Sequence, residues 1–286
     1  MRLFALTTLT MVAFAANSVL NRLALEGGDT GPAAFAAIRL GTGALALTLM
    51  VMARGGGFRL WTPGRAPGAA TLAIYVLGFS FAYVSLDAGL GALILFGVVQ
   101  MTMFAGALIG GERPNAVRMI GAAISLTGLA WLLWPSGSTA PPGLGALLMA
   151  AAGVGWGLYS LIGRGASDPL SETAANFVVA APAALLIGAL VWDGASVSGI
   201  VLATVSGVVT SGLGYALWYR VLPQIDASAA AIAQLSVPVI AFAGGALLLG
   251  EVLTGRFLGA SVLVLGGLAL GVLWRKPQRS MGSSAS

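Results

Sequence analysis

Residues 103–112 are MFAGALIGGE and residues 241–251 are AFAGGALLLGE, so one pattern of small and apolar residues that ends in Gly-Glu occurs twice in the chain. Each copy is followed by a glycine-rich apolar stretch that ends in Leu-Trp, at Trp134 and at Trp274. A composition rich in Ala, Gly and Leu produces chance similarity easily, but it does not by itself place Gly-Glu at equivalent points. The chain is therefore predicted to contain two copies of one unit.

A weaker match lies near the start of each copy. At a constant offset of 142 residues, three positions of the first copy align with three of the second: Phe14, Ser18 and Arg22 with Trp156, Ser160 and Arg164. We predict a first unit over residues 1–135, a second over residues 143–275, and a short tail over residues 276–286.

The composition is typical of an integral membrane protein. Hydrophobic residues make up 58% of the 286 residues and charged residues only 8%, whereas charged residues approach a quarter of a soluble domain. The mean hydropathy is +0.96. A helix needs roughly 20 residues to cross the hydrocarbon core of a bilayer, so the chain has room for about ten crossings with short loops. A soluble catalytic domain is excluded.

Ten apolar segments separated by turn-forming residues meet this length requirement. They are residues 3–25, 32–53, 66–86, 90–109, 116–134, 143–162, 170–191, 197–219, 227–249 and 256–274. Asn17, Asn21 and Arg22 interrupt the first segment, which favours a helix over a signal peptide. We predict an all-α integral membrane protein with ten transmembrane helices, five in each unit.

Basic residues are distributed unevenly between the two sides that these segments define. One side receives eleven: Arg2, Arg54, Arg59, Arg65, Arg113, Arg118, Arg164, Arg220, Arg275, Lys276 and Arg279. The other side receives only Arg22 and Arg256, and Arg39 falls inside the second segment. Because cytoplasmic loops are enriched in Lys and Arg, we expect both termini in the cytoplasm. An odd number of helices per unit makes the two units cross in opposite directions, an inverted repeat found in many secondary transporters.

Further motifs accompany the repeat. The first unit has Pro32 and then Ala36-Ala-Ile-Arg39, and the second has AAAIAQLSVPVI at residues 229–240 before the Leu-Gly-Glu that ends at Glu251. With these motifs, residues 3–274 resemble two copies of the EamA-type module of the drug/metabolite transporter superfamily. The resemblance implies a ten-helix exporter of small metabolites, most similar to the YddG kind, which exports aromatic and other amino acids. One departure is that Pro238 of the second unit aligns with Gln100 of the first.

The chain lacks residues that several classes of function require. It has no histidine and no cysteine, which removes Ser-His-Asp and Cys-His catalysis, structural zinc sites and cysteine-ligated clusters. No pair of carboxylates lies within a segment, so hydrolytic chemistry lacks its usual groups, and no repeated selectivity ring indicates a channel. The net charge of +5 reflects loop arginines and not nucleic-acid binding. We expect no enzyme activity, no cofactor and no metal.

Polar and aromatic side chains inside the segments are the candidate substrate-binding residues. Amides there bind zwitterions or act as glue between helices. Aromatic residues that recur every three or four positions share a helix face, which lines a pocket or packs against lipid. The candidates are Asn17, Phe79, Tyr83, Gln100, Trp156, Tyr159, Tyr215 and Gln234.

Charged residues near segment ends receive structural roles. Arg39 is expected to pair with Glu26 or Asp29 of the nearby loop, because an unpaired charge inside a membrane is costly. Glu112 and Glu251 are expected to make capping or gate contacts near Arg113 and Arg256 rather than to touch substrate.

The expected function is an inner-membrane exporter of small metabolites, amino acids of aromatic or apolar preference, that works by alternating access through a midplane cavity. The expected partners are this small-molecule substrate and the lipid bilayer, with a monomer as the assembly. Since every acid falls at or near a segment end, we expect no proton coupling, with Asp87 or Asp226 as the alternative proton carrier. The alternatives are a carrier for drugs or other metabolites and, with less support, a channel or membrane enzyme.

Overall fold

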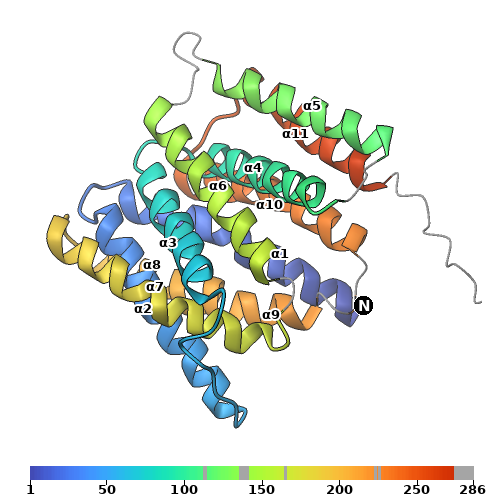
Figure 1. Cartoon of the computed structure of the whole chain (residues 1–286). Helices are drawn as coiled ribbons and strands as arrows, with labels where there is room; N and C mark the ends of the chain where they lie inside the picture. Colours follow the sequence, from blue (N-terminus) through green and yellow to red (C-terminus); the bar gives the residue numbers. More distant parts are fainter. Residues whose placement is uncertain (112–114, 135–141, 164–165, 222–223, 225–226, 274–286) are drawn as a thin grey trace, which may run out of the picture.

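The computed structural model describes residues 1–111, 115–134, 142–163, 166–221, 224 and 227–273. Within these ranges the chain forms helices joined by short connections and no strand, which confirms the expected all-helical class (Figure 1). Glu112, Arg113, Asp226 and the tail 276–286 lie outside the described residues.

The helices follow the predicted segments. Their bounds are α1 (Arg2–Leu25), α2 (Pro32–Ala53), α3 (Arg65–Ala82), α4 (Ala88–Ile109), α5 (Ala116–Leu133), α6 (Gly143–Gly163), α7 (Pro169–Val191), α8 (Val197–Val205), η2 (Ser206–Leu213), α9 (Gly214–Val221), α10 (Ala227–Leu249) and α11 (Gly255–Leu273). The three short segments α8, η2 and α9 follow one another without a break and replace one predicted helix, with η2 wound as a π-helix.

Seven of the described helical segments are long and apolar enough to cross a membrane: α1, α2, α4, α5, α6, α7 and Val197–Trp218. Ala233–Leu249 and Gly255–Gly271 are shorter apolar helices. The chain is therefore a multi-pass membrane protein, and membrane crossing by all ten predicted helices stays a prediction.

Local chemistry explains where several helices begin and end. Pro32 and Pro169 stand at the first positions of α2 and α7, where the missing N–H of proline costs nothing. The hydroxyl of Ser196 accepts a hydrogen bond from the backbone N–H of Gly199 at 3.1 Å and caps α8. α10 ends before Gly250, whose φ of +67° favours glycine.

Helices of the first half of the chain pack mainly against helices of the second half. α1 packs against α10, and α4 packs against α6; α3 packs against α6, and α1 packs against α8, η2 and α9. Three further pairs join α2 with α7, α4 with α10 and α5 with α11. Figure 1 shows α5 and α11 together along the upper edge of the bundle and α2 with α7 near the opposite edge. The centre of the molecule therefore lies between the two halves.

A close approach of α6 to α3 brings aromatic residues together in this centre. A Cβ atom on Gly155 would lie 2.8 Å from the carbonyl oxygen of Thr71 and 2.9 Å from the backbone nitrogen of Tyr75. Only glycine fits at so short a separation. The neighbouring residue, Trp156, is thereby held against the Tyr75 side chain, with ring centroids 4.8 Å apart.

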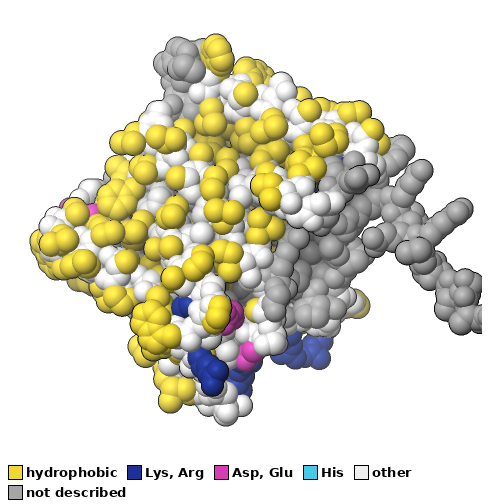
Figure 2. All heavy atoms as spheres, in the orientation of Figure 1, with side chains coloured by type: hydrophobic (Ala, Val, Ile, Leu, Met, Phe, Trp, Pro, Cys, Tyr) yellow, Lys and Arg dark blue, Asp and Glu magenta, His cyan; other side chains and the backbone are white. Residues whose placement is uncertain are grey.

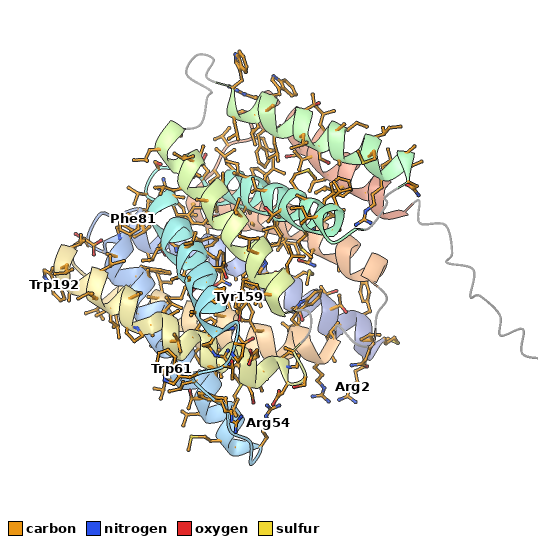
Figure 3. The ribbon with its side chains drawn as sticks, in the orientation of Figure 1. Arg2, Arg54, Trp61, Phe81, Tyr159 and Trp192 are labelled. Carbon is orange, nitrogen blue, oxygen red and sulfur yellow. The ribbon has the colours of Figure 1, made fainter. Side chains whose placement is uncertain are left out.

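The bundle has an apolar exterior and two ends of different composition. Hydrophobic side chains cover most of the face in Figure 2, and Lys and Arg atoms gather at its lower edge, where Figure 3 labels Arg2 and Arg54. We call this the Arg54 end, and Arg54 forms an ion pair there with Asp168. The opposite end is the Trp192 end, labelled at the left of Figure 3.

Candidate functional site

A cavity lies in the centre of the bundle and is lined by residues from both halves of the chain. Its walls come from α1, α3, α4, α6 and α9: Phe14, Asn17, Ser18, Tyr75, Phe79, Leu95, Phe96, Trp156 and Tyr215. Four of the eight predicted binding residues, Asn17, Phe79, Trp156 and Tyr215, are thus brought together. Most of the remaining wall is aromatic or apolar, as in ligand pockets generally.

Asn17 is a polar group in the cavity wall and is held in place across helices. Its side-chain oxygen accepts hydrogen bonds from the hydroxyl of Ser206 at 2.8 Å and from the hydroxyl of Thr210, both on η2. Asn21, one turn further along α1, donates to the Ser80 hydroxyl at 3.0 Å. The glue interpretation therefore describes both amides, and Asn17 in addition faces the cavity.

The aromatic wall is continuous across the two halves. The Trp156 ring lies 4.8 Å from the Tyr75 ring and 5.2 Å from the Tyr215 ring, and the Phe14 ring lies 5.9 Å from the Tyr215 ring, measured between centroids. Rings at such distances attract one another beyond simple area burial. The wall is therefore a packed set of flat faces that suits an aromatic or aliphatic side chain.

Two predicted aromatic residues stand behind the wall rather than in it. The Tyr83 hydroxyl donates to the carbonyl oxygen of Ala88 at 3.3 Å, and the Tyr83 ring packs 4.7 Å from Phe79. The Tyr159 hydroxyl donates to Thr173 of α7 at 3.4 Å, and the Tyr159 ring lies 5.5 Å from Trp156. In this conformation both residues support lining residues.

The two glutamines are outside the set of lining residues. Gln100 and Gln234 are half-buried on α4 and α10, and the cavity wall on α4 is made by Leu95 and Phe96. Helical periodicity puts Gln100 one turn beyond Phe96, so the glutamine continues that face of α4 toward its C-terminus.

Several lining residues were not among the predicted ones. Phe14 had a signal in the sequence, because the repeat alignment equates Phe14 with Trp156, and both rings line the cavity. Ser18 had no signal beyond its alignment with Ser160, which is not a lining residue. Tyr75 also had a signal, since it stands four residues before Phe79. Leu95 and Phe96 had none, because nothing in an unbroken apolar run distinguishes a cavity-facing residue from a lipid-facing one.

The cavity is narrow in this conformation. Its volume is about 20 Å³, counted as the space open to the centre of a water molecule, whereas one water needs about 10–15 Å³ on the same measure. An amino acid does not fit until side chains or helices move apart. The conformation is therefore constricted around its central cavity.

Arg39 does not form the expected ion pair. Within the described residues the ion pairs are Arg54 with Asp168 and Arg65 with Glu172, so pairing of Arg39 with Glu26 or Asp29 was a wrong prediction. Arg39 lies about two turns into α2, and its guanidinium turns into the bundle toward α3 and η2. Glu26 and Asp29 are exposed in the loop before α2.

Acidic residues hold helix N-termini at the Trp192 end. The Asp193 carboxylate accepts hydrogen bonds from the backbone N–H groups of Ala33 and Ala34 at 2.8 and 3.0 Å. The Glu251 carboxylate accepts hydrogen bonds from Ala88 and Gly89 at the start of α4. Negative groups are favoured at such helix starts. The predicted capping role of Glu251 matches these contacts.

Glu251 at the Trp192 end and Asp168 at the Arg54 end have carboxyl pKa values that are shifted for different reasons. Burial raises the pKa of the Glu251 carboxyl above its usual range, against the opposing effect of the two N–H donors. At the Arg54 end, the Arg54 guanidinium lowers the pKa of Asp168 to about 2. The pKa values of these two carboxyls are therefore shifted in opposite directions.

Comparisons with known proteins agree with the helical architecture. The EamA-like transporter family matches residues 143–273. The chain is 49% identical over 276 residues to an uncharacterized protein of Pseudomonas aeruginosa, with 94% of each chain covered. It is 28% identical over 229 residues to a probable amino-acid metabolite efflux pump of Escherichia coli, covering 72% of this chain and 76% of that protein.

Two more similarities span nearly the whole chain. The uncharacterized transporter YwfM of Bacillus subtilis is 27% identical over 276 residues, with 92% of each chain covered. A solved crystal structure superposes with a TM-score of 0.65 at 22% identity, covering 93% of this chain and 97% of that one, which supports the fold alone. An apolar multi-pass helical bundle with a central cavity is an architecture expected of a membrane transporter, and the second half of this chain, residues 143–273, belongs to the EamA-like transporter family.

Proposed function

We propose that this transporter exports amino acids with aromatic or apolar side chains. The observation that carries the proposal is the central cavity. Both halves of the chain contribute to its aromatic wall, and its single amide, Asn17, comes from the first half. Flat apolar faces accept the side chain of such a substrate, and an amide binds a zwitterion without adding a net charge. The two efflux pumps among its relatives, in Escherichia coli and Salmonella typhimurium, are named for amino-acid metabolites, which favours the same substrate class.

The architecture in this proposal is ten transmembrane helices arranged as two inverted five-helix units, residues 1–135 and 143–275. The reciprocal packing supports it, because exchange of the two units maps the α1–α10 pair onto the α6–α4 pair and leaves the α2–α7, α4–α10 and α5–α11 pairs in place. In secondary transporters built from inverted repeats, the substrate site lies at the interface of the repeats, and we expect the same here. The likeness to YddG-type exporters belongs to the same proposal.

Alternating access then proceeds by motion of one unit against the other. Glu251 joins the end of α10 to the start of α4, and Asp193 joins the loop after α7 to the start of α2. Both contacts close the Trp192 end. In this proposal that end faces the periplasmic side of an inner membrane, since basic residues gather at the other end and are enriched in cytoplasmic loops. Opening of that end requires separation of these two pairs of segments.

The carrier in this proposal is a monomer without proton coupling. Among the described residues that line the cavity, none is acidic, so a proton has no carboxylate at the substrate site. A carrier of this kind equilibrates its substrate down an existing gradient, which suffices to remove a metabolite that accumulates in the cell.

Transport by the purified protein in liposomes tests the proposal. Labelled phenylalanine, leucine and glutamate should be compared with an aromatic cation and a sugar in a counterflow assay, where trapped unlabelled substrate drives uptake. We expect phenylalanine and leucine to exchange and glutamate and the sugar not to exchange. Exchange of the aromatic cation alone would instead favour a drug carrier, for which the aromatic wall is also suited.

A further inference from the structure

Arg39 is a charged residue about two turns into α2, and none of the carboxylates that the structure describes forms an ion pair with it. The side chain is 1% exposed, and the seven described acidic residues, Glu26, Asp29, Asp87, Asp168, Glu172, Asp193 and Glu251, all lie in loops or at helix ends. A buried charge without a counter-charge is costly in any protein interior and more so within a membrane. Retention of Arg39 therefore requires a compensating interaction.

The contacts of Arg39 compensate it only in part. Its Nε donates to the Ser211 hydroxyl at 3.2 Å, and its Nη2 donates to the Tyr75 hydroxyl at 3.1 Å. The guanidinium carbon lies 5.4 Å from the Tyr75 ring centroid and 5.0 Å from the Phe79 ring centroid, which is cation–π distance. Nη1 is buried and has no hydrogen-bond partner among the residues that the structure describes. The Nη1 side of the Arg39 guanidinium is thus left for a hydrogen-bond acceptor.

The comparison with Arg65 shows that this arrangement is not a general property of the fold. Arg65 is equally buried, at 2% exposed, but its Nη2 lies 2.8 Å from the Glu172 carboxylate and its Nη1 donates to Asn176 at 2.8 Å. The protein therefore neutralises one deeply buried arginine with its own carboxylate and leaves the other without one.

Arg39 stands directly behind the cavity wall. The two rings that it contacts, Tyr75 and Phe79, are both lining residues. The π-helical segment η2 also connects the guanidinium to the cavity, since Ser211 holds Arg39 while Ser206 and Thr210 hold Asn17. π-Helical segments occur frequently at functional sites. A substrate enters the narrow cavity only after the wall widens, and the Tyr75 and Phe79 rings are the part of that wall that lies against the guanidinium.

We propose that Arg39 binds the carboxylate of the transported amino acid and thereby acts as the anionic-group subsite of the cavity. A guanidinium presents parallel N–H donors that match the two oxygens of a carboxylate. One fixed positive charge balances one carboxylate, whereas a phosphate group would leave a second negative charge in apolar surroundings. The ammonium group of the same substrate faces the aromatic rings, which attract cations. This inference rests on the proposed function and specifies its substrate chemistry.

The first test uses the unmodified protein and therefore does not depend on the folding of any variant. In phenylalanine counterflow, three competitors separate the charged groups of the substrate: phenylpropionate has only the carboxylate, phenethylamine only the ammonium, and phenylalaninamide an amide in place of the carboxylate. We expect phenylpropionate to compete and the two compounds without a carboxylate to bind about ten- to a hundredfold more weakly than phenylalanine. Equal competition by phenethylamine would overturn the role of Arg39 while leaving amino-acid transport in place.

The second test compares Arg39→Gln and Arg39→Lys with the matched control Arg65→Gln. Arg39→Gln should weaken phenylalanine binding about ten- to a hundredfold and leave phenethylamine binding within about twofold of the unmodified protein, so that the preference for a carboxylate disappears. Arg39→Lys should keep part of that preference. Arg65→Gln should reduce folded protein without changing the preference. Equal loss of both ligands in the folded Arg39 variants would show a merely structural arginine. Failure of the unmodified protein to exchange any amino acid would contradict the proposed function itself.

Discussion

The Glu251 carboxylate lies 3.1 Å from the backbone nitrogen of Gly89 and joins the segment after α10 to the first turn of α4. Ala88 donates to the same carboxylate. The two residues are 162 positions apart in the chain, so this helix cap is also a contact between the two halves. It closes the Trp192 end beside the central cavity.

Removal of this cap should open the Trp192 end. A helix cap is worth about 0.5–2 kcal/mol, which corresponds to a shift of about two- to thirtyfold in the opening equilibrium. The chain has no cysteine, so the buried cavity residue Ser18 can be changed to Cys as a single reporter. We expect an impermeant thiol reagent to label it faster in Glu251→Ala than in the parent and at an intermediate rate in Glu251→Gln. An unchanged rate in both variants would contradict the closing role.

The side chains of Trp156 and Gln100 should differ in importance for transport. Trp156 lines the cavity and contacts the rings of Tyr75, Tyr159 and Tyr215, whereas Gln100 is not among the lining residues. We expect Trp156→Ala to lower phenylalanine exchange by about tenfold or more and to lower the melting temperature, with Trp156→Phe retaining most of both. Gln100→Ala should change exchange by less than about twofold. Equal loss of exchange per folded molecule in the two alanine variants would restore Gln100 to the substrate site.

An imposed pH gradient should not drive accumulation of substrate. Asp87 is exposed, and Asp226 lies outside the described residues and stays an alternative. Glu251, with its raised pKa, is a further alternative proton carrier. Liposomes that contain the protein and labelled phenylalanine should keep an internal-to-external ratio near unity when the pH differs across the membrane. Sustained accumulation that disappears in Glu251→Gln would establish coupling through that residue.

The ion pair of Arg54 with Asp168 should contribute to stability only above acidic pH. The pKa of Asp168 is lowered to about 2 from its ordinary value of 3.8, so the folded state favours the ionised carboxylate. The stabilisation is present above pH 3.8 and is lost as the pH falls through about 2. Because the two side chains are 41% and 47% exposed, the effect is at most about 1 kcal/mol. Melting curves of Asp168→Asn and Arg54→Gln at neutral pH should show equally small losses, and a large loss in either would contradict a screened surface pair.

The inverted-repeat proposal makes a direct topological prediction. Ser138, in the connection between α5 and α6, lies outside the described residues, and ten helices place it on the outer side. A single Cys at this position should react with an impermeant reagent from outside intact cells, while Cys in place of the exposed Ser167 should react only after the membrane is opened. Reaction of position 138 from the cytoplasmic side alone would show that the units are not inverted.

The sequence by itself determined the class of protein and the positions of the helices. Hydrophobicity and helix-stop residues act locally, so the apolar runs, Pro32, Pro169 and Gly250 are sufficient to place helix bounds to within a few residues. The repeated Gly-Glu motif also predicts which segments are equivalent, and the alignment of Phe14 with Trp156 marked two residues that line one cavity.

Only the tertiary structure decided which side chains face the cavity and which face each other. In a chain that is apolar on every helix face, periodicity does not separate inward from outward residues, so Leu95 and Phe96 gave no signal. Gln100 is not among the lining residues, and its role in substrate binding stays a prediction. The same limit applies to Arg39. Its expected partners were near in sequence, at Glu26 and Asp29, but the rotation of α2 within the bundle turns the guanidinium toward Tyr75 and Ser211, because burial against α3 and η2 depends on the packing of helices far apart in the chain.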